Sequence, residues 1–252
     1  MSGNVKCESP VSFPIKPPGQ TKVWKVIEIK VPKSATPIKF SIQEVPEDRY
    51  EEIVEYMCKY FIVDEPICKS FNGINDPEFV EDFRQFWKEF IKHGLTVAAF
   101  VENPNGGKPI IAAVNMLALS LKEDDMELDA LKTEKGQRLM TVLVNLSKEA
   151  NIYEKYGVDR YMSAFGLSVH PFYRGAALGA HLLNARTDIG REYKISVTST
   201  AFTSPISQKL AARCGFETVA EKNFNEFVDE DGNEILPGIE SKCLKIMAKK
   251  LY

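Results

Sequence analysis

The chain has 252 residues, of which 44% are hydrophobic and 27% are charged, a composition sufficient for one compact α/β domain with a full core. The formal net charge of −3 and the lack of a long Lys/Arg cluster argue against a nucleic-acid partner. No apolar stretch has the form of a signal peptide or the length of a membrane span, so we expect a cytoplasmic protein without membrane contact.

The five cysteines do not form any pair with the spacing of a zinc or redox motif. They lie far apart, at positions 7, 58, 68, 214 and 243. An odd number of scattered cysteines indicates reduced thiols. We also expect no metal, because no cluster of His, Cys and Asp has the spacing of a metal site.

The N-terminal residues 1–20 contain four prolines and no apolar period, which predicts an extended or disordered arm ahead of a single domain over residues 21–252. Segments 23–31 and 38–45 alternate apolar and polar residues as β-strands do. From Pro46 the apolar residues recur at helical spacing. This first helix ends at a break, Val63-Asp64-Glu65-Pro66.

Asp76 and Pro77 are typical of a helix start, and Gly94 of its end. Strands over 96–101 and 110–119 flank the turn-forming sequence ENPNGGK, which predicts a hairpin. The remaining periodicity predicts helices over about 136–156, 175–191 and 205–214, and strands over 160–169, 195–201, 216–222 and 242–251. Together these elements predict an α/β fold in which a mixed sheet carries helices on both faces.

The segment from Val169 to Ala180, VHPFYRGAALGA, lies where a predicted strand runs into a helix. Its small side chains allow backbone N–H groups to approach an anion, the helix N-terminus adds a partial positive charge, and Arg174 adds a cation. It is neither a P-loop nor a G-x-G-x-x-G turn. The segment therefore predicts a phosphate-binding turn. The alternative is a tightly packed helix start.

This segment resembles the acetyl-CoA signature of the GNAT superfamily, Gln/Arg-x-x-Gly-x-Gly/Ala, matched by residues 174–179, with the approach V-x-P-x-Y-R-G before it. Over residues 37–250 the chain is similar to the insect arylalkylamine N-acetyltransferase branch, in the order of elements, in the VDEPI break and in Ser207, Lys209, Gly215 and Phe216 near the end. The resemblance implies a GNAT fold, whose central sheet is mixed, mostly antiparallel and twisted.

The resemblance also implies acetyl-CoA as cosubstrate, with the strand before the turn beside its pantetheine arm. The residues that it implies for cofactor binding are Leu167, Ser168, Val169, Arg174, Gly175, Ala176, Ala177, Leu178, Gly179, Ala180 and Ser207. One position departs from the signature, because its middle glycine is Ala177. An alanine at a helix N-terminus needs no special backbone angles, so we expect the N–H donors to remain, although the methyl group could crowd the pyrophosphate.

Acetyl transfer to an amine needs a base for the nucleophile, donors for the oxyanion and support for the leaving thiolate. By resemblance, the base corresponds to Glu65, acting through water, and the serines that support the thiolate correspond to Thr203 and Ser207. A glutamate before proline is otherwise often a solvated loop residue. Asp64 is the neighbouring carboxylate most easily confused with Glu65. Ser204 ahead of Pro205 has the pattern of a helix N-cap.

Many GNAT enzymes use a tyrosine as the acid, but from Lys194 onward the only tyrosine is Tyr252, which disfavours that arrangement. For His170 we favour a histidine satisfied at the surface or within its loop.

These observations predict an N-acetyltransferase that transfers the acetyl group of acetyl-CoA to the primary amine of a small molecule in a ternary complex. An arylalkylamine is the first choice of acceptor and a polyamine or agmatine-like amine the second. The partner is then a small-molecule amine, and we expect a monomer or weak dimer. Two alternatives stay open: a GNAT-like protein that binds CoA with little turnover, and a protein N-acetyltransferase.

Overall fold

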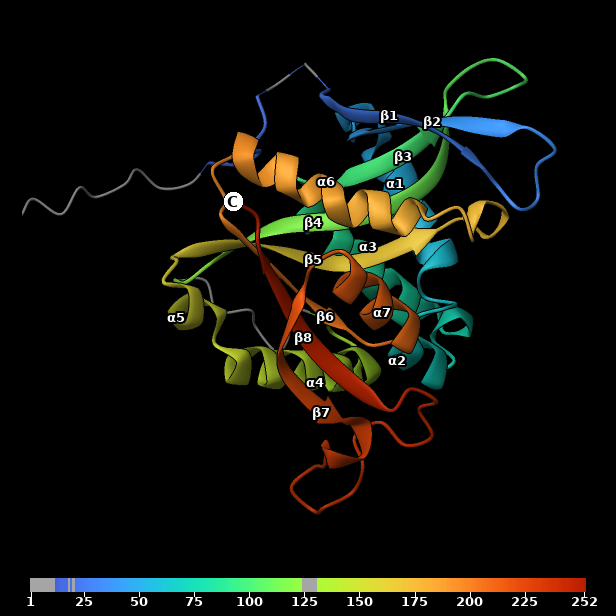
Figure 1. Ribbon diagram of the computed structural model, residues 1–252. Coiled ribbons are helices and arrows are strands. Elements are labelled where there is room, and N and C mark those ends of the chain that lie inside the picture. The colour runs from blue at the N-terminus through green and yellow to red at the C-terminus, as the bar shows by residue number, and fades with distance from the viewer. Residues whose placement is uncertain (1–11, 18, 20, 124–130) are drawn as a thin grey trace, which may run out of the picture.

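The computed structural model describes residues 12–17, 19, 21–123 and 131–252 (Figure 1). Of the predicted N-terminal arm, residues 1–11, 18 and 20 therefore lie outside the described part. Within the rest, the backbone N–H of Ile15 donates to His93 O at 3.0 Å, and the Lys16 ammonium donates to Val45 O at 2.6 Å. The Phe13 ring stacks on His93. Through these contacts this part of the arm lies against the body of the domain.

One eight-stranded sheet runs through the molecule (Figure 1). Its strands are β1 (Val23–Lys30), β2 (Pro37–Glu44), β3 (Val97–Val101), β4 (Ile110–Leu121), β5 (Arg160–Val169), β6 (Val197–Phe202), β7 (Glu217–Asn223) and β8 (Cys243–Lys250). Their spatial order is β1-β2-β3-β4-β5-β6-β8-β7, and all neighbours are antiparallel except β5 and β6. The prediction of a mixed, mostly antiparallel sheet is confirmed.

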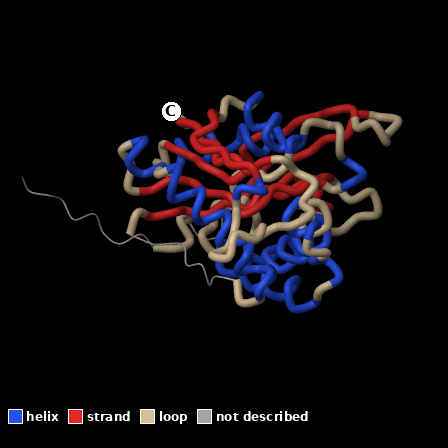
Figure 2. Tube along the Cα trace, turned by 90° about the horizontal axis from the view of Figure 1, so that it is seen from below, coloured by secondary structure: helices blue, strands red, loops and turns tan. Residues whose placement is uncertain are grey.

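Helices cover both faces of this sheet, as predicted (Figures 1 and 2). They are α1 (Tyr50–Tyr60), α2 (Pro66–Ser70), α3 (Pro77–Ile91), α4 (Glu134–Ala150), α5 (Ile152–Tyr156), α6 (Leu178–Glu192) and α7 (Pro205–Arg213), with 3-10 turns at Glu47–Arg49, Gly73–Asn75, Pro171–Tyr173 and Phe224–Glu226. The apolar sides of α1, α3 and α4 form one core with one face of the sheet. Helix α6 packs against the other face, and α7 packs beside α6.

Local sequence signals explain where several helices begin and end. Asp76 caps α3 by accepting a hydrogen bond from Phe79 N at 3.2 Å, and Pro77 occupies the first helical position, as predicted. The predicted helix over 136–156 is divided into α4 and α5, because Asn151 adopts a left-handed conformation with φ of 42°. The short helix α2 was not predicted and follows directly from the break at Glu65-Pro66.

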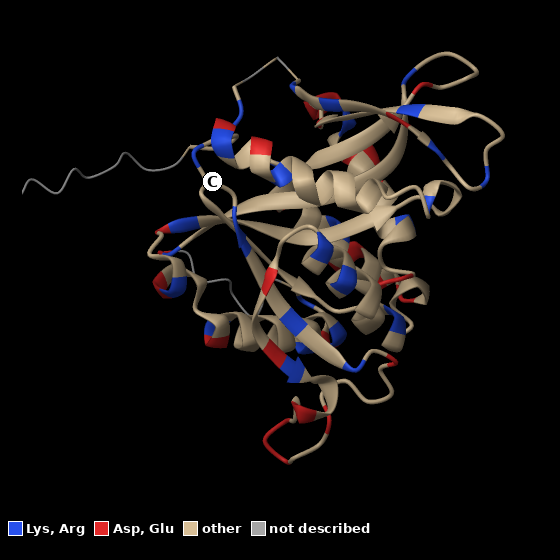
Figure 3. Ribbon diagram, in the orientation of Figure 1, with Lys and Arg blue, Asp and Glu red and all other residues tan. Residues whose placement is uncertain are grey.

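The acidic sequence between β7 and β8 forms a turn (Figure 3). The carboxylate of Asp229 accepts hydrogen bonds from the backbone N–H groups of Asp231 and Asn233 at 3.0 and 2.8 Å. These bonds hold the pKa of Asp229 below its usual value. Among the described residues, no helix has both the length and the apolar character needed to cross a membrane.

Candidate active site

The sheet opens between β5 and β6. These two neighbours are parallel, and their register joins a single pair of residues, Met162 and Thr198, near the start of both strands. Beyond that pair the strands diverge. Since β6 is fully paired with β8 on its other side, the divergence leaves one side of β5 without a partner strand toward its C-terminal end.

The backbone of β5 presents polar groups to this opening. The N–H of His170 donates to Ala112 O at 2.9 Å, which makes these residues a hydrogen-bonded pair of the antiparallel β4–β5 ladder. Such pairs alternate with pairs whose N–H and C=O point away from the partner strand. Leu167 and Val169 therefore direct their backbone groups away from β4, toward the opening. This is the geometry that an extended ligand needs in order to add to the edge of a strand.

A bulge in β5 lies beside these groups. The β4–β5 register shifts between Asn115 and Leu117, and Gly166 adopts a φ of 131°. A Cβ at Gly166 would lie 2.7 Å from Met57 Cε, so helix α1 approaches the bulge as closely as a glycine permits. The bulge thus brings the α1 side of the site close to the strand.

The predicted phosphate turn has two left-handed residues, Gly175 with φ of 82° and Ala177 with φ of 56°. Helix α6 consequently begins at Leu178 and not at about 175. Among the described residues, the backbone N–H groups from Arg174 to Gly179 have no hydrogen-bond acceptor, and the first bonded amide is that of Ala180, which donates to Ala177 O at 3.0 Å. A run of free amides at a helix start is the arrangement that binds phosphate.

The expectation that Ala177 needs no special backbone angles is wrong. Ala177 is the N-cap of α6 and holds the left-handed conformation that the glycine of the signature would adopt freely. The free amides are nevertheless present, because residues 174–179 all precede the first hydrogen-bonded amide of α6, that of Ala180.

Ala177→Gly should therefore raise the free energy of unfolding by about 0.5–1 kcal/mol, since the steric cost of a left-handed alanine exceeds the entropy lost by glycine. Ala176, whose φ is not in the left-handed region, supplies the matched control. Ala176→Gly should lower the same free energy by a similar amount. Urea denaturation of both variants measures the difference, and a loss of stability in both would contradict the assignment.

Arg174 does not extend freely into the turn. Its Nε donates to Val169 O at 2.9 Å, and one Nη forms an ion pair with the Asp64 carboxylate. Both side chains of the pair are about half exposed. The pair joins the phosphate turn to the segment between α1 and α2, so the structure brings Arg174 and Asp64 together with the C-terminal end of β5.

Glu65 is buried, with 9% of its surface exposed, and is the N-cap of α2. Its Oε2 accepts the backbone N–H of Cys68 at 2.7 Å, while Oε1 is buried and has no hydrogen-bond partner among the described residues. Glutamate is not a favoured N-cap, and a buried unpaired carboxylate oxygen costs about 1–3 kcal/mol. The solvated-loop interpretation of Glu65 is therefore wrong. An unpaired oxygen of this kind calls for a ligand or a water as its partner.

Thr203 and Ser207 lie at the junction of β6 and α7. Ser204 caps α7, as its pattern predicted, and the Ser207 hydroxyl donates to Ser204 O at 2.9 Å within a capping box. Thr203 O accepts the hydroxyl of Ser241, whose neighbour Glu240 pairs with Lys69 of α2 at 2.7 Å. Residues 240–241 thus connect this junction with the helix that Glu65 caps.

His170 follows β5 and is satisfied within its own loop, as predicted. Its Nδ1 accepts the backbone N–H of Phe172 at 3.2 Å, and its ring lies edge-on to Tyr60 at 4.8 Å. Partial burial, with Lys59 and Arg174 nearby, lowers the pKa of His170. The Tyr56 hydroxyl donates to Ala112 O at 3.2 Å, and burial raises its pKa well above the usual value.

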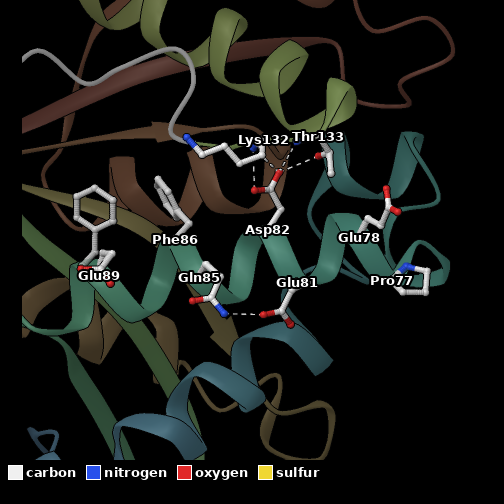
Figure 4. Close-up of a pocket in the computed structure, with 10 residues that line it drawn as sticks. Pro77, Glu78, Glu81, Asp82, Gln85, Phe86, Glu89, Lys132 and Thr133 are labelled. Atoms are coloured by element: carbon white, nitrogen blue, oxygen red, sulfur yellow. Dashed lines mark hydrogen bonds between the residues drawn. The ribbon is translucent and has the colours of Figure 1, made fainter.

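A separate hollow of about 800 Å³ lies between α3 and residues 132–133 (Figure 4). Its lining includes Phe86 and Phe90, whose rings also contact Phe165 of β5 at 5.1 and 4.3 Å. Asp82 points toward Lys132 and Thr133 and accepts both of their backbone N–H groups at 2.8 Å. No residue predicted for the site lines this hollow, and Asp82 serves to anchor the start of α4.

Two residues near the opening were missed by the sequence analysis. Asn115 is fully buried on β4, and Arg186 of α6 is buried with 1% of its surface exposed. The Arg186 side chain donates to Asn115 Oδ1 and to the hydroxyls of Thr198 and Thr200. Burial lowers the pKa of Arg186 to about 9.

The splayed parallel pair, the free edge of β5 and the amide-lined turn into the next helix define an acetyltransferase of the GNAT superfamily. The structure superposes on a protein of the yellow fever mosquito Aedes aegypti that is named putative arylalkylamine N-acetyltransferase 7. The TM-score is 0.84 and the sequence identity 30%, over 92% of this chain and 96% of that chain. The chain belongs to the insect arylalkylamine N-acetyltransferase family, and it is thus an N-acetyltransferase of the acyltransferase class.

More distant structures share the fold. Arylalkylamine N-acetyltransferase 2 from Aedes aegypti has a TM-score of 0.73 and 22% identity, over 84% of this chain and 99% of that chain. The polyamine N-acetyltransferase of Drosophila melanogaster has a TM-score of 0.72 and 17% identity over the same shares. No protein-family model matches the sequence, and no curated protein matches it.

Proposed function

We propose that the chain transfers the acetyl group of acetyl-CoA to the primary amine of a small molecule. The opening between β5 and β6 carries this proposal, because it combines a free strand edge with a run of unpaired amides at the start of α6. A pantetheine arm offers the amides that a strand edge can pair with, and a pyrophosphate is the anion that such a turn favours. The free edge of β5 leads directly into the amide-lined turn, just as the pantetheine arm of CoA leads directly to the pyrophosphate.

Within this proposal the Leu167 C=O and the backbone of Val169 pair with the pantetheine arm, and the free amides of residues 175–179 hold the pyrophosphate. The Ala180 amide, which was also predicted to take part, is instead bonded to Ala177 O. Arg174 adds a positive charge, and it must exchange or share its Asp64 partner to reach the phosphates. Gly179 permits the close contact between α6 and α7, because a Cβ there would lie 2.9 Å from the Leu210 side chain of α7. Ala176, Leu178, Ser168 and Ser207 complete the proposed cofactor contacts.

The proposed reaction begins when Glu65, directly or through one water, takes a proton from the protonated amine. The neutral amine nitrogen then forms a bond with the thioester carbon, and the carbonyl oxygen becomes an oxyanion that accepts a hydrogen bond from the free N–H of Leu167 in β5. As the C–S bond breaks and the C=O bond re-forms, the nitrogen loses its second proton, and the leaving thiolate takes it up to become the CoA thiol. The Thr203 and Ser207 hydroxyls support this thiolate. For that role the Ser207 hydroxyl must turn away from Ser204 O.

An arylalkylamine is the acceptor that we favour, since aromatic rings surround the bulge at Gly166. Phe61 lies 2.9 Å from the position of a Gly166 Cβ and packs edge-on against Trp87 at 5.6 Å. Aromatic rings of this kind bind aryl groups and accept edge-to-face contacts. The relatives named for polyamine and agmatine acetylation are 17% identical and leave the polyamine class as the second choice.

A panel of about twenty amines tests the acceptor class. Calorimetry first measures acetyl-CoA binding to the purified chain, and a thiol reagent then follows CoA release with tyramine, dopamine, serotonin, agmatine, spermidine and a lysine-bearing peptide. We expect kcat/KM to be at least about tenfold higher for an arylalkylamine than for the aliphatic amines. A preference for the peptide would contradict the small-molecule acceptor.

A further inference from the structure

Arg186 is a buried cation without an acidic partner. Its guanidinium lies on the sheet side of α6, and all its hydrogen bonds go to neutral groups: Asn115 Oδ1 at 3.0 Å from Nε and 2.9 Å from Nη2, and Thr198 and Thr200 Oγ1 at 3.1 and 2.8 Å from Nη1. Among the described residues no carboxylate pairs with it. Burying an unpaired charge is costly, so a side chain that merely fills space would be apolar here.

Arg186 lies at the point where β5 and β6 separate. Thr198, one of its acceptors, is also the residue of β6 that pairs with β5, and its hydroxyl donates to Met162 O at 2.8 Å. The other acceptor, Asn115, belongs to β4 on the opposite side of β5. The guanidinium therefore crosses β5 on the side that faces α6 and bonds to both neighbouring strands, β4 and β6.

Asn115 links the Arg186 guanidinium to the bulge of β5. Its Nδ2 donates to Gly166 O at 2.9 Å, while its Oδ1 accepts two hydrogen bonds from Arg186. Hydrogen bonds in such a chain strengthen one another, and a cation at one end strengthens all of them. In a trans peptide the N–H points opposite to the C=O, so the N–H of Leu167 points away from Asn115. It is one of the groups that β5 directs toward the opening.

We propose that Arg186, acting through Asn115, holds and polarises the Gly166–Leu167 peptide so that the Leu167 N–H donates to the acetyl carbonyl oxygen. This inference rests on the proposed function, because it assumes that the thioester lies along β5. Arg186 and Asn115 are positioning residues and do not touch the reacting atoms. The positive charge of Arg186 also favours the negative charge that develops on that oxygen.

Three variants separate this role from a structural one. Arg186→Met removes the charge, Asn115→Leu removes the link to Gly166, and Ser199→Ala removes a buried hydroxyl of β6 that donates to Met247 O of β8. We expect the first two to lower kcat about tenfold or more, with KM for acetyl-CoA changed less than about threefold. The double variant should lose about twofold at most beyond either single variant, since both act on one peptide. Ser199→Ala should keep kcat within about twofold, because its hydroxyl bonds to neither Arg186 nor Asn115.

The carbonyl resonance of bound [1-¹³C]acetyl-CoA gives a reading that does not depend on turnover. In the wild-type chain we expect this resonance to move downfield from its free position, and in Arg186→Met and Asn115→Leu to lose at least half of that shift. Either variant alone is sufficient should the other fail to fold. A carbonyl shift and kcat in Arg186→Met equal to those of Ser199→Ala would overturn the inference, as would wild-type turnover without a carbonyl shift. Failure of the wild-type chain to bind acetyl-CoA would instead overturn the proposed function.

Discussion

Replacing Glu65 with glutamine should lower kcat for amine acetylation about 100-fold or more, with the Kd for acetyl-CoA changed less than about threefold. Glutamine has the same shape, and its oxygen can still accept the Cys68 N–H, so α2 keeps its cap. Only the ability to take a proton is lost. Initial rates with the fastest amine of the panel, together with calorimetry for acetyl-CoA, measure the two quantities.

The matched control is Asp76→Asn, which alters a capping carboxylate on α3 in the same way. Because the Asp76 carboxylate contacts Phe79 N and the Lys135 ammonium and no residue of the proposed site, its variant should retain kcat within about twofold. Equal losses of kcat in both variants, or a parallel loss of kcat and acetyl-CoA affinity in Glu65→Gln, would remove Glu65 from the role of base.

Replacing Gly175 with valine should weaken cofactor binding and leave the chemical step intact, the reverse of the effect expected for Glu65→Gln. The Kd for CoA should rise about tenfold or more, and kcat at saturating acetyl-CoA should change little. Gly175 has a φ of 82°, which β-branched residues rarely adopt, and a Cβ would lie 3.0 Å from Pro32 Cγ. The turn must move to accommodate the side chain. Each amide that loses a charged phosphate oxygen costs about 1.5–3 kcal/mol, and 1.4 kcal/mol is tenfold in Kd.

Gly106 provides the control for backbone strain. Its φ is 78°, and among the described residues no atom lies within 4 Å of a Cβ built there. Gly106→Val therefore imposes a similar backbone cost in the β3–β4 hairpin, outside the phosphate turn. Calorimetric titration with CoA should show wild-type affinity for Gly106→Val. If both valine variants bound CoA equally well, the turn would not be the pyrophosphate site.

Most of the fold could be predicted, because apolar periodicity and capping residues are local properties of the sequence. Strand β5 has the predicted bounds, 160–169, and Asp76 and Pro77 start α3 as expected. Helix α2 was missed since its five residues are too few to establish a period. The left-handed conformation of Ala177 could not be predicted, because the apolar period of α6 continues smoothly back to Gly175.

The site was predictable only in part. The phosphate turn could be found from its small residues and its place after a strand, and Glu65 from resemblance alone. Its buried, unpaired oxygen depends on how α2 packs, which no local pattern encodes. The sequence did contain a signal for both residues. Arg186 lies on the buried side of α6 between Leu182 and Ile189, and Asn115 is the single polar residue in the apolar run 110–119.

The central claim is that this chain moves an acetyl group from acetyl-CoA to a small amine, and the stoichiometry of that transfer tests it most directly. The wild-type chain is incubated with acetyl-CoA and each amine of the panel, and free thiol and N-acetylated amine are measured together, the latter by mass spectrometry. We predict equal amounts of both products with at least one arylalkylamine, and neither above background with Glu65→Gln. Acetyl-CoA bound in calorimetry but no thiol and no N-acetylated product from any amine would contradict the claim.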